Sequence, residues 1–285
     1  MKNLILRTIT GIVYVALLVG CVISGPIGTF AFFSIVAMAA LWEFGTILNK
    51  NARTQLCCPI NSLAGLVLSG AVWLSCVASP TSSKAFALYG ITLLYLIIRE
   101  LYLKHEDPIR NWAFSFASQI YIALPLSLVS LIYIYRDTES GNITFNWIYL
   151  LSLFVFLWIN DTGAYLSGLC LHNVFPTKLF PRISPKKTWV GSIGGGILTL
   201  AASAAIWKLC QTYSGETEKI SFWIGLALVV VIFGTWGDLV ESLLKRQLDI
   251  KDSGHILPGH GGILDRFDSC LLAIPAAIAY IYLMA

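Results

Sequence analysis

Charged residues are scarce in this sequence. Only 12% of the 285 residues are Asp, Glu, Lys or Arg and 57% are apolar, whereas a typical soluble domain has about 25% charged residues. The chain also lacks low-complexity tracts, and 13% of its residues are aromatic. The shortage of charge excludes an ordinary soluble globule, and the varied composition excludes a disordered or fibrous chain. We therefore expect a protein that crosses a membrane several times.

Signatures of several catalytic and metal sites are absent as well. The seven cysteines include no Cys-x-x-Cys pair, and their odd number cannot close a complete disulfide framework. No Walker A motif precedes Lys187, and the sequence contains neither His-Glu-x-x-His nor Gly-x-Ser-x-Gly. These absences argue against a disulfide scaffold, a P-loop nucleotidase, a zinc enzyme and a serine hydrolase.

Long apolar runs are what the sequence has in abundance. Each is long enough to cross about 30 Å of hydrocarbon, the last one only barely. The backbone inside a bilayer must be helical, because hydrocarbon offers no partner for free N–H and C=O groups. The sequence thus predicts an all-α polytopic membrane protein with about nine transmembrane helices, at residues 5–25, 28–48, 62–79, 84–103, 112–135, 147–170, 189–210, 221–237 and 269–284.

Basic residues predict the orientation of these spans, because cytoplasmic loops carry an excess of Lys and Arg. If the N-terminus is cytoplasmic, 15 of the 19 basic residues fall on the cytoplasmic side. The other side receives only the remaining four, Lys84, Arg136, Lys208 and Lys219. We therefore expect the N-terminus inside and the C-terminus outside.

The longest polar insertions, at about 171–188 and 238–268, both fall on the predicted cytoplasmic side. This asymmetry indicates chemistry at one membrane face. We accordingly divide the chain into N-terminal transmembrane helices, residues 1–146, and a C-terminal catalytic transmembrane region, residues 147–285.

A stripe of polar side chains marks the end of the eighth predicted span, which we expect to continue as a helix through Arg246. Asp238, Glu241, Ser242 and Lys245 have the spacing i, i+3, i+4 and i+7, which places them on one helix face. A solvated face would explain such a stripe in most proteins. Here Asp238 lies within or just at the end of the apolar slab, where an ionisable group is costly and a functional partner is expected.

The segment after this helix is rich in groups suited to phosphate chemistry. Glycines in Pro258–Gly262 allow a backbone to approach a ligand closely, and carboxylates such as Asp265 are oxygen ligands of the kind that Mg²⁺ combines with phosphate and water. Positive charge comes from Lys245, Arg246, Lys251 and Arg266, and further oxygens from Asp249, Asp252 and Asp268. His260 is either functional or merely structural on this pattern.

A second polar cluster is expected at the same membrane face. Asp161 interrupts the sixth span in its cytoplasmic third, and Lys178 and the segment Ser184–Thr188 precede the seventh span. Snorkelling lysines would account for Lys178. The proline-stiffened group of basic and hydroxyl residues in Ser184–Thr188 favours contact with phosphate instead.

Three segments of this sequence resemble those of phosphatidate cytidylyltransferases, the CDP-diacylglycerol synthases. Residues Ser242–Asp268 fit the pattern SxxKRxxxxKDxGxxLPGHGGxLDRFD, which is a very specific match. Asp161–Gly168 and Ser184–Trp189 resemble two further blocks of the family. The chain departs from the family at Val190, where Glu or Gln is usual, and at 169–173, where a basic residue and a second glycine are common.

The resemblance implies that CTP and phosphatidate react to give CDP-diacylglycerol and pyrophosphate with Mg²⁺ as cofactor. Asp238 and Asp265 would hold the metal, and we expect Asp161 to help organise the same site. The other catalytic residues implied are Lys245, Arg246, Lys251 and Arg266. Substrate contacts would come from Ser184, Lys186, Lys187, Ser242, Gly259, His260, Gly261 and Gly262.

Topology and resemblance together imply an integral protein of a bacterial inner membrane with its active site facing the cytoplasm. Its expected partners are the two substrates and the lipid bilayer, with no nucleic acid. A CTP-dependent lipid kinase and a transporter are the alternatives, although a transporter would place its site near the midplane. Acyl-chain preference, the use of dCTP, a second cation such as K⁺ and a homodimer stay open on the sequence.

Overall fold

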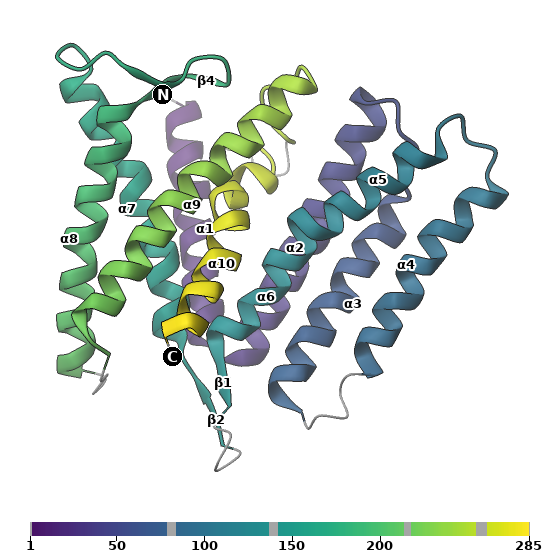
Figure 1. Ribbon diagram of the computed structural model, residues 1–285, viewed down its shortest axis with the longest axis horizontal. Helices are drawn as coiled ribbons and strands as arrows, with labels where there is room; N and C mark the ends of the chain where they lie inside the picture. The colour runs from purple at the N-terminus through teal and green to yellow at the C-terminus, as the bar shows by residue number, and fades with distance from the viewer. Residues whose placement is uncertain (1, 79–83, 137–141, 214–217, 255–260, 285) are drawn as a thin grey trace. The chain divides into compact units, whose positions relative to one another are not determined.

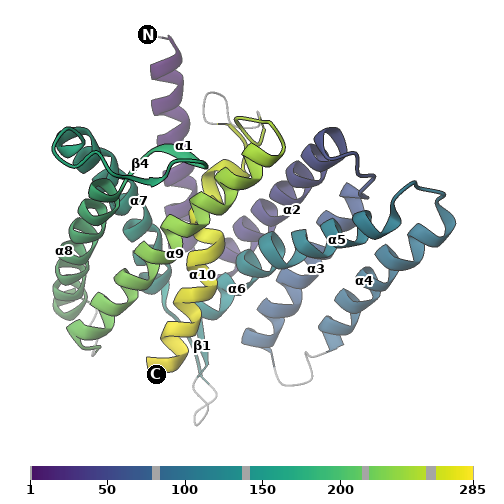
Figure 2. The ribbon, with the colours of Figure 1, turned by 45° about the horizontal axis from the view of Figure 1, so that its top comes forward.

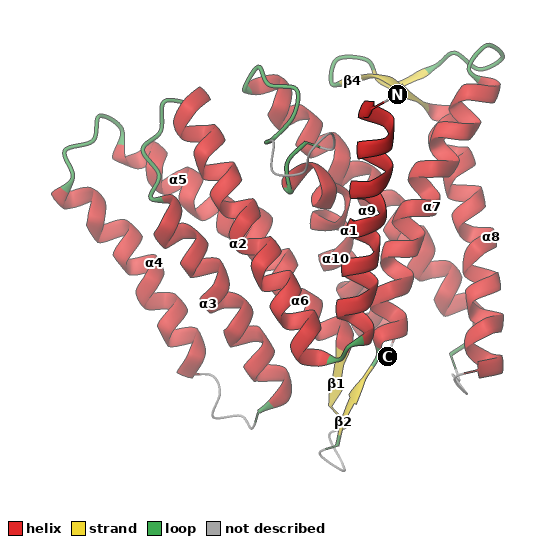
Figure 3. Cartoon of the chain, turned by 180° about the vertical axis from the view of Figure 1, so that it is seen from behind, coloured by secondary structure: helices red, strands yellow, loops and turns green. Residues whose placement is uncertain are grey.

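The computed structural model describes residues 2–78, 84–136, 142–213, 218–254 and 261–284, without the side chains of residues 2–7, 136 and 213 (Figure 1). Helices dominate the described residues, and two short antiparallel hairpins interrupt them (Figure 3). In chain order the elements are α1 (Lys2–Ile23), α2 (Pro26–Asn51), α3 (Cys58–Val77), α4 (Lys84–Tyr102), α5 (Pro108–Ser118), the π-helical turn η2 (Gln119–Ala123), α6 (Leu124–Tyr133), β1 (Ile134–Arg136), β2 (Ile143–Phe145), α7 (Trp147–Leu171), β3 (Lys178–Phe180), β4 (Ser184–Thr188), α8 (Trp189–Tyr213), α9 (Ile220–Gln247) and α10 (Leu264–Met284).

The helices confirm the predicted all-α polytopic membrane protein. Within the described residues, eight helical segments are long and apolar enough to cross a membrane, with α5, η2 and α6 acting as one segment, Pro108–Tyr133. A shorter apolar helix, Thr8–Ile23, lies at the first predicted span. The α9 helix extends through Arg246, as expected. The last span, predicted to be barely long enough at 269–284, begins earlier, at Leu264, and has 21 residues. The orientation of the termini stays a prediction.

Proline and capping residues define where several helices begin. Pro26, Pro59 and Pro108 each lie in the first turn of a helix, where the missing N–H costs nothing and the fixed φ angle suits the helix. The Asp107 side chain caps α5 by accepting a hydrogen bond of 3.0 Å from the Arg110 backbone N–H. These local signals explain why α2, α3 and α5 begin where they do.

Two compact units make up the chain. The first comprises residues 1–150 and 247–267, and the second comprises residues 151–246 and 268–285. In the first unit, α3 packs against α2, α4 and α6. A buried polar cluster lies at the π-helical turn, where Gln119 donates to Asn61 at 2.8 Å and Asn61 donates to Ser118 at 2.7 Å. Such a satisfied network meets the need of buried amides for partners inside an apolar bundle.

The second unit contains the rest of α7, α8, α9 and most of α10, which approach one another closely at glycines. A Cβ atom at Gly195 would lie 2.5 Å from the Asn160 carbonyl oxygen, and one at Gly237 would lie 2.6 Å from the Asp268 carbonyl oxygen. Small residues allow this close packing of helices. The β3–β4 hairpin connects the C-terminal end of α7 to the N-terminal end of α8 (Figure 2), in a stretch whose strands the sequence does not predict.

Candidate active site

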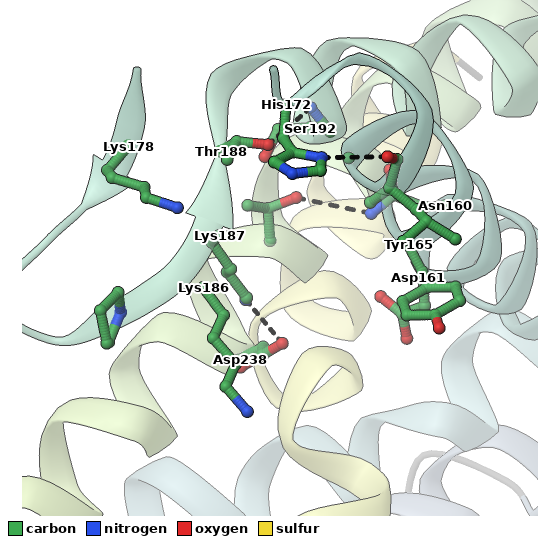
Figure 4. A pocket seen from close by; sticks show the side chains of 16 residues that line it. Asn160, Asp161, Tyr165, His172, Lys178, Lys186, Lys187, Thr188, Ser192 and Asp238 are labelled. Atoms are coloured by element: carbon green, nitrogen blue, oxygen red, sulfur yellow. Dashed lines mark hydrogen bonds and ion pairs between the residues drawn. The ribbon is translucent and has the colours of Figure 1, made fainter. Parts of the chain in front are cut away.

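A cavity of about 540 Å³ lies within the second unit, at the end that carries the β3–β4 hairpin (Figure 4). This volume falls in the usual range for small-molecule sites, about 300–1,000 Å³. Its lining comes from α7, α8, α9 and both strands of the hairpin, and includes Asn160, Asp161, Tyr165, His172, Lys178, Lys186, Lys187, Thr188, Ser192 and Asp238. The structure thus brings the cluster at 161–188 together with Asp238 of the α9 stripe, 50 positions after Thr188 in the sequence.

An ion pair joins the hairpin to α9 inside this cavity. The Lys187 Nζ atom lies 2.6 Å from Asp238 Oδ2, and both side chains are about 30% exposed. The Ser242 hydroxyl, one helical turn further along α9, donates to Asp238 Oδ1 at 3.2 Å. Both Asp238 oxygens therefore have a partner, and Figure 4 shows the Lys187 side chain reaching the Asp238 carboxylate, with Lys186 next to it in the cavity lining.

Local structure holds the hairpin over the cavity. The Thr188 hydroxyl accepts a hydrogen bond of 3.2 Å from the Gly191 backbone N–H, which caps the start of α8. Gly191 itself leaves no room for a side chain, since a Cβ would lie 2.8 Å from the Ala164 carbonyl oxygen. At the turn of the hairpin, Arg246 donates to the Ile183 carbonyl oxygen at 3.3 Å. Arg246 thus has a structural contact in addition to its predicted catalytic role.

The polar stripe on α9 forms as the sequence predicts. Besides the Ser242–Asp238 bond, Lys245 makes an i,i+4 ion pair with Glu241, whose side chain is fully buried. A buried carboxylate needs such a partner, because its desolvation is otherwise uncompensated. Glu241 therefore fixes the position of Lys245.

Asp268 also belongs with these residues. Its carboxylate interacts electrostatically with three charged side chains of the same unit, Asp161, Asp238 and Lys245. On the sequence, Asp268 is predicted only as one of several possible oxygen ligands and not as a site residue. Its place as the last fixed residue of the 242–268 pattern is the signal that could have identified it.

Ser184 lies on β4 in the second unit but is not among the residues that line the cavity. The other predicted residues that the structure describes lie in the first unit. Asp265, in the first turn of α10, accepts hydrogen bonds on Oδ2 from the backbone N–H groups of Ser253 at 2.9 Å and Gly262 at 2.7 Å. Gly261 has a φ angle of +82°, which favours glycine. Lys251 and Arg266 are exposed. Gly259 and His260 lie outside the described residues.

Carboxylate oxygens are available for a hard cation in both units. No three Asp, Glu, His or Cys side chains are grouped closely enough to hold an ion in the part of the chain that the structure describes. A site with one or two carboxylates suits Mg²⁺, which usually keeps water and substrate phosphate among its ligands. Asp238 and Asp265 belong to different units, so their joint binding of one ion stays a prediction.

Comparison with known proteins identifies the family of this chain. The model of the "Cytidylyltransferase family" matches residues 5–284. Curated relatives named phosphatidate cytidylyltransferase include one from Staphylococcus aureus (strain COL), 32% identical over 277 residues, and one from Staphylococcus saprophyticus, 31% identical over 273 residues; each alignment covers 94% of this chain and 95% of the relative. A family match over nearly the whole chain, together with these relatives, shows that the chain belongs to the cytidylyltransferase family.

Proposed function

We propose that this enzyme transfers the cytidylyl group of CTP to phosphatidate, giving CDP-diacylglycerol and pyrophosphate for phospholipid synthesis. The observation that carries the proposal is the cavity in which Lys186 and Lys187 lie beside Asp238. Lysines supply the positive charge that bound phosphates require, and the carboxylate suits a divalent cation. The printed names of the relatives, which are phosphatidate cytidylyltransferases, support the same reaction.

The reaction requires no nucleophile from the protein. A phosphate oxygen of phosphatidate forms a bond to the α-phosphorus of CTP, in line with the bond from that phosphorus to the bridging oxygen of the β-phosphate. This second bond breaks, and pyrophosphate leaves with the bridging oxygen. The protein then contributes mainly by positioning the two substrates and by stabilising the charge that develops on them.

Positive side chains near the cavity have distinct roles in this proposal. Ser184, Lys186 and Lys187 contact substrate phosphates from the hairpin, while Lys245 and Arg246 neutralise the triphosphate and the leaving pyrophosphate from α9. Lys251 and Arg266, which belong to the segment 247–267 of the first unit, also neutralise the charge of the triphosphate and pyrophosphate. Ser242, Gly261 and Gly262, with Gly259 and His260, complete the contacts to the nucleotide.

Asp238 and Asp265 would hold Mg²⁺, and Asp161 would help to organise the site. When bound, the cation supplies positive charge to the phosphate oxygens of the nucleotide. The fit rests on the donor set, since both residues offer hard oxygen ligands and neither is part of a thiol or imidazole cluster. We place the reaction at the cytoplasmic face of a bacterial inner membrane, where the lipid headgroup can reach the cavity while its acyl chains stay in the bilayer.

A labelled-nucleotide assay tests the function. Purified protein in detergent–phosphatidate mixed micelles would receive CTP labelled at the α-phosphate, with Mg²⁺ or with a chelator. We expect Mg²⁺-dependent transfer of label into the lipid phase and release of pyrophosphate. Soluble labelled CDP, formed with a lipid alcohol in place of phosphatidate, would identify a lipid kinase instead. Absence of turnover with either lipid would overturn the proposal and favour a transporter.

A further inference from the structure

Glu43 is a buried carboxylate in the C-terminal half of a membrane-spanning helix, and the proposed reaction gives it no part. It lies on α2 and is only 5% exposed. Ionisable side chains within membrane helices are costly, and they usually mark a functional partner. The contacts of Glu43 identify that partner within the first unit.

Three hydrogen bonds hold the Glu43 carboxylate, and all come from residues more than 200 positions away in the sequence. The Ser253 hydroxyl donates to Oε1 at 2.6 Å. The backbone N–H groups of Ile263 and Leu264 donate to Oε2 at 3.0 Å and to Oε1 at 3.1 Å, respectively. Leu264 begins α10, so Glu43 places a negative charge at the N-terminus of this helix, where the unpaired N–H groups and the helix dipole favour an anion.

Two glycines allow the backbone to pass directly against this carboxylate. A Cβ atom added at Gly254 would overlap Glu43 Oε2, and one added at Gly262 would overlap Glu43 Oε1. Gly254 and Gly262, which flank residues 255–260, thus both pack directly against the Glu43 side chain. Any larger residue at either position would displace the backbone or the carboxylate.

Ser253 links Glu43 to Asp265. The Ser253 backbone N–H donates to Asp265 Oδ2 at 2.9 Å, and the Ser253 hydroxyl accepts from the Asp265 backbone N–H at 3.3 Å. Since the same hydroxyl donates to Glu43, Ser253 connects α2 to the Asp265 backbone N–H through its hydroxyl and to the Asp265 carboxylate through its own backbone N–H. Moving Glu43 therefore moves the groups that orient Asp265.

We propose that Glu43 is a positioning residue for the cytidylyl transfer, which fixes the orientation of Asp265, the carboxylate that would hold Mg²⁺. The inference rests on the proposed function for the identity of the nucleotide. Groups that orient a metal ligand typically change metal affinity or activity by about 10–100-fold when they are removed. Glu43 should act by this route, through Asp265 and not by touching substrate.

The test compares two substitutions of buried carboxylates in the same unit. Glu43→Gln keeps the shape of the side chain, but its amide nitrogen can take the place of Oε2 and would then face the Ile263 N–H donor to donor. Glu100→Gln is the matched control. Glu100 is also buried and accepts hydrogen bonds from His105 at 2.8 Å and Asn111 at 2.9 Å, but it has no link to Asp265 among the hydrogen bonds described for it.

Mn²⁺ binding followed by electron paramagnetic resonance, in the absence of both substrates, gives a readout separate from turnover. We expect Glu43→Gln to weaken Mn²⁺ binding about tenfold or more and to raise the Mg²⁺ concentration needed for half-maximal rate. Glu100→Gln should lower the thermal midpoint while leaving Mn²⁺ affinity unchanged. If Glu43→Gln does not fold, Ser253→Ala removes the hydroxyl that connects Glu43 to Asp265 and should weaken Mn²⁺ binding in the same direction.

Unchanged Mn²⁺ affinity in the folded Glu43 or Ser253 variant would overturn the inference. So would an equal loss in the Glu100 variant, because Glu43 would then act only on stability, and so would a wild-type protein that binds no Mn²⁺. Failure of the proposed function has a different signature: the wild-type protein would bind Mn²⁺ with an affinity that depends on Glu43 but would not transfer label from CTP to phosphatidate.

Discussion

The Lys187 ammonium and the Asp238 carboxylate form an ion pair of 2.6 Å between strand β4 and helix α9. The two residues are 51 positions apart in the sequence. Lys187 belongs to the polar insertion at 171–188, and Asp238 belongs to the one at 238–268. Lys187 supplies positive charge at the carboxylate for which we predict a divalent cation. If the substrate phosphate binds beside Asp238, the Lys187 ammonium is positioned to contact that phosphate.

Loss of the Lys187 charge should reduce catalysis more than stability. The pair is partly exposed, so it contributes at most about 1 kcal/mol to folding. A charged hydrogen bond to a substrate phosphate is worth more, about 1.5–3 kcal/mol. We expect Lys187→Met to lower kcat/KM for CTP by about tenfold to a hundredfold with little change in thermal midpoint. Lys208→Met, at an exposed lysine of α8 outside the cavity lining, is the control, and an equal effect there would contradict the prediction.

Asp265→Asn separates the predicted metal role of Asp265 from its structural one. The asparagine oxygen can still accept the N–H groups of Ser253 and Gly262, which now bond to Oδ2, so the variant should fold and insert. It lacks the negative charge that a cation requires, and most Mg²⁺-dependent turnover should disappear. Initial rates over a Mg²⁺ titration, with the thermal midpoint as a folding control, measure both effects. Near-normal activity would exclude Asp265 as a metal ligand.

Glu241 and Lys245 should be coupled in stability. Lys245→Met removes the positive charge from beside a fully buried carboxylate, and breaking one half of such a pair costs about 3–5 kcal/mol. The double variant Glu241→Gln/Lys245→Met has no buried charge at this position and should recover much of the lost thermal stability. Activity should stay low in both proteins if Lys245 contacts phosphate. A double variant no more stable than the single one would show that the two residues are not coupled.

Neighbouring glycines of α8 should respond differently to alanine. A Cβ at Gly195 meets Asn160 and Ala164 of α7 at 2.5–3.0 Å, including backbone atoms, whereas a Cβ at Gly196 meets only Val231 Cγ1 at 3.4 Å. Overpacking typically costs about 1–3 kcal/mol, and separating α7 from α8 would also displace Asp161. We therefore expect Gly195→Ala to lower both thermal midpoint and turnover, and Gly196→Ala to resemble the wild type. Equal midpoints would contradict this account of the helix contact.

The sequence anticipated the stripe on α9 because its cause is local. Residues three and four apart share a helix face whatever surrounds them, and the Ser242–Asp238 and Lys245–Glu241 contacts follow from that spacing. Glu43 gave no comparable signal. It stands alone in an apolar run, and its partners Ser253, Ile263 and Leu264 lie at the other end of the chain.

The hairpin shows the same division. Its basic and hydroxyl residues are recognisable in the sequence. The pairing of β3 with β4, in which Lys178 lies opposite Thr188, explains how these residues come to lie on one hairpin. Two contacts between the hairpin and α9 hold the hairpin in place: the hydrogen bond from Arg246 to Ile183 and the ion pair between Lys187 and Asp238. Both depend on the close approach of α9. The packing of the helices sets this approach, and a short stretch of sequence does not predict how distant helices pack.

The class of protein, the approximate position of its spans and the segments that carry charge can all be predicted from the amino-acid sequence. These follow from composition and short-range periodicity, because a bilayer accepts only long apolar helices. The partners of the charged groups follow from the folded arrangement instead: Lys187 pairs with Asp238, and Glu43 accepts hydrogen bonds at the start of α10. The reason is physical, since a buried charge is stabilised by whichever partner the packing of distant helices brings within hydrogen-bonding distance.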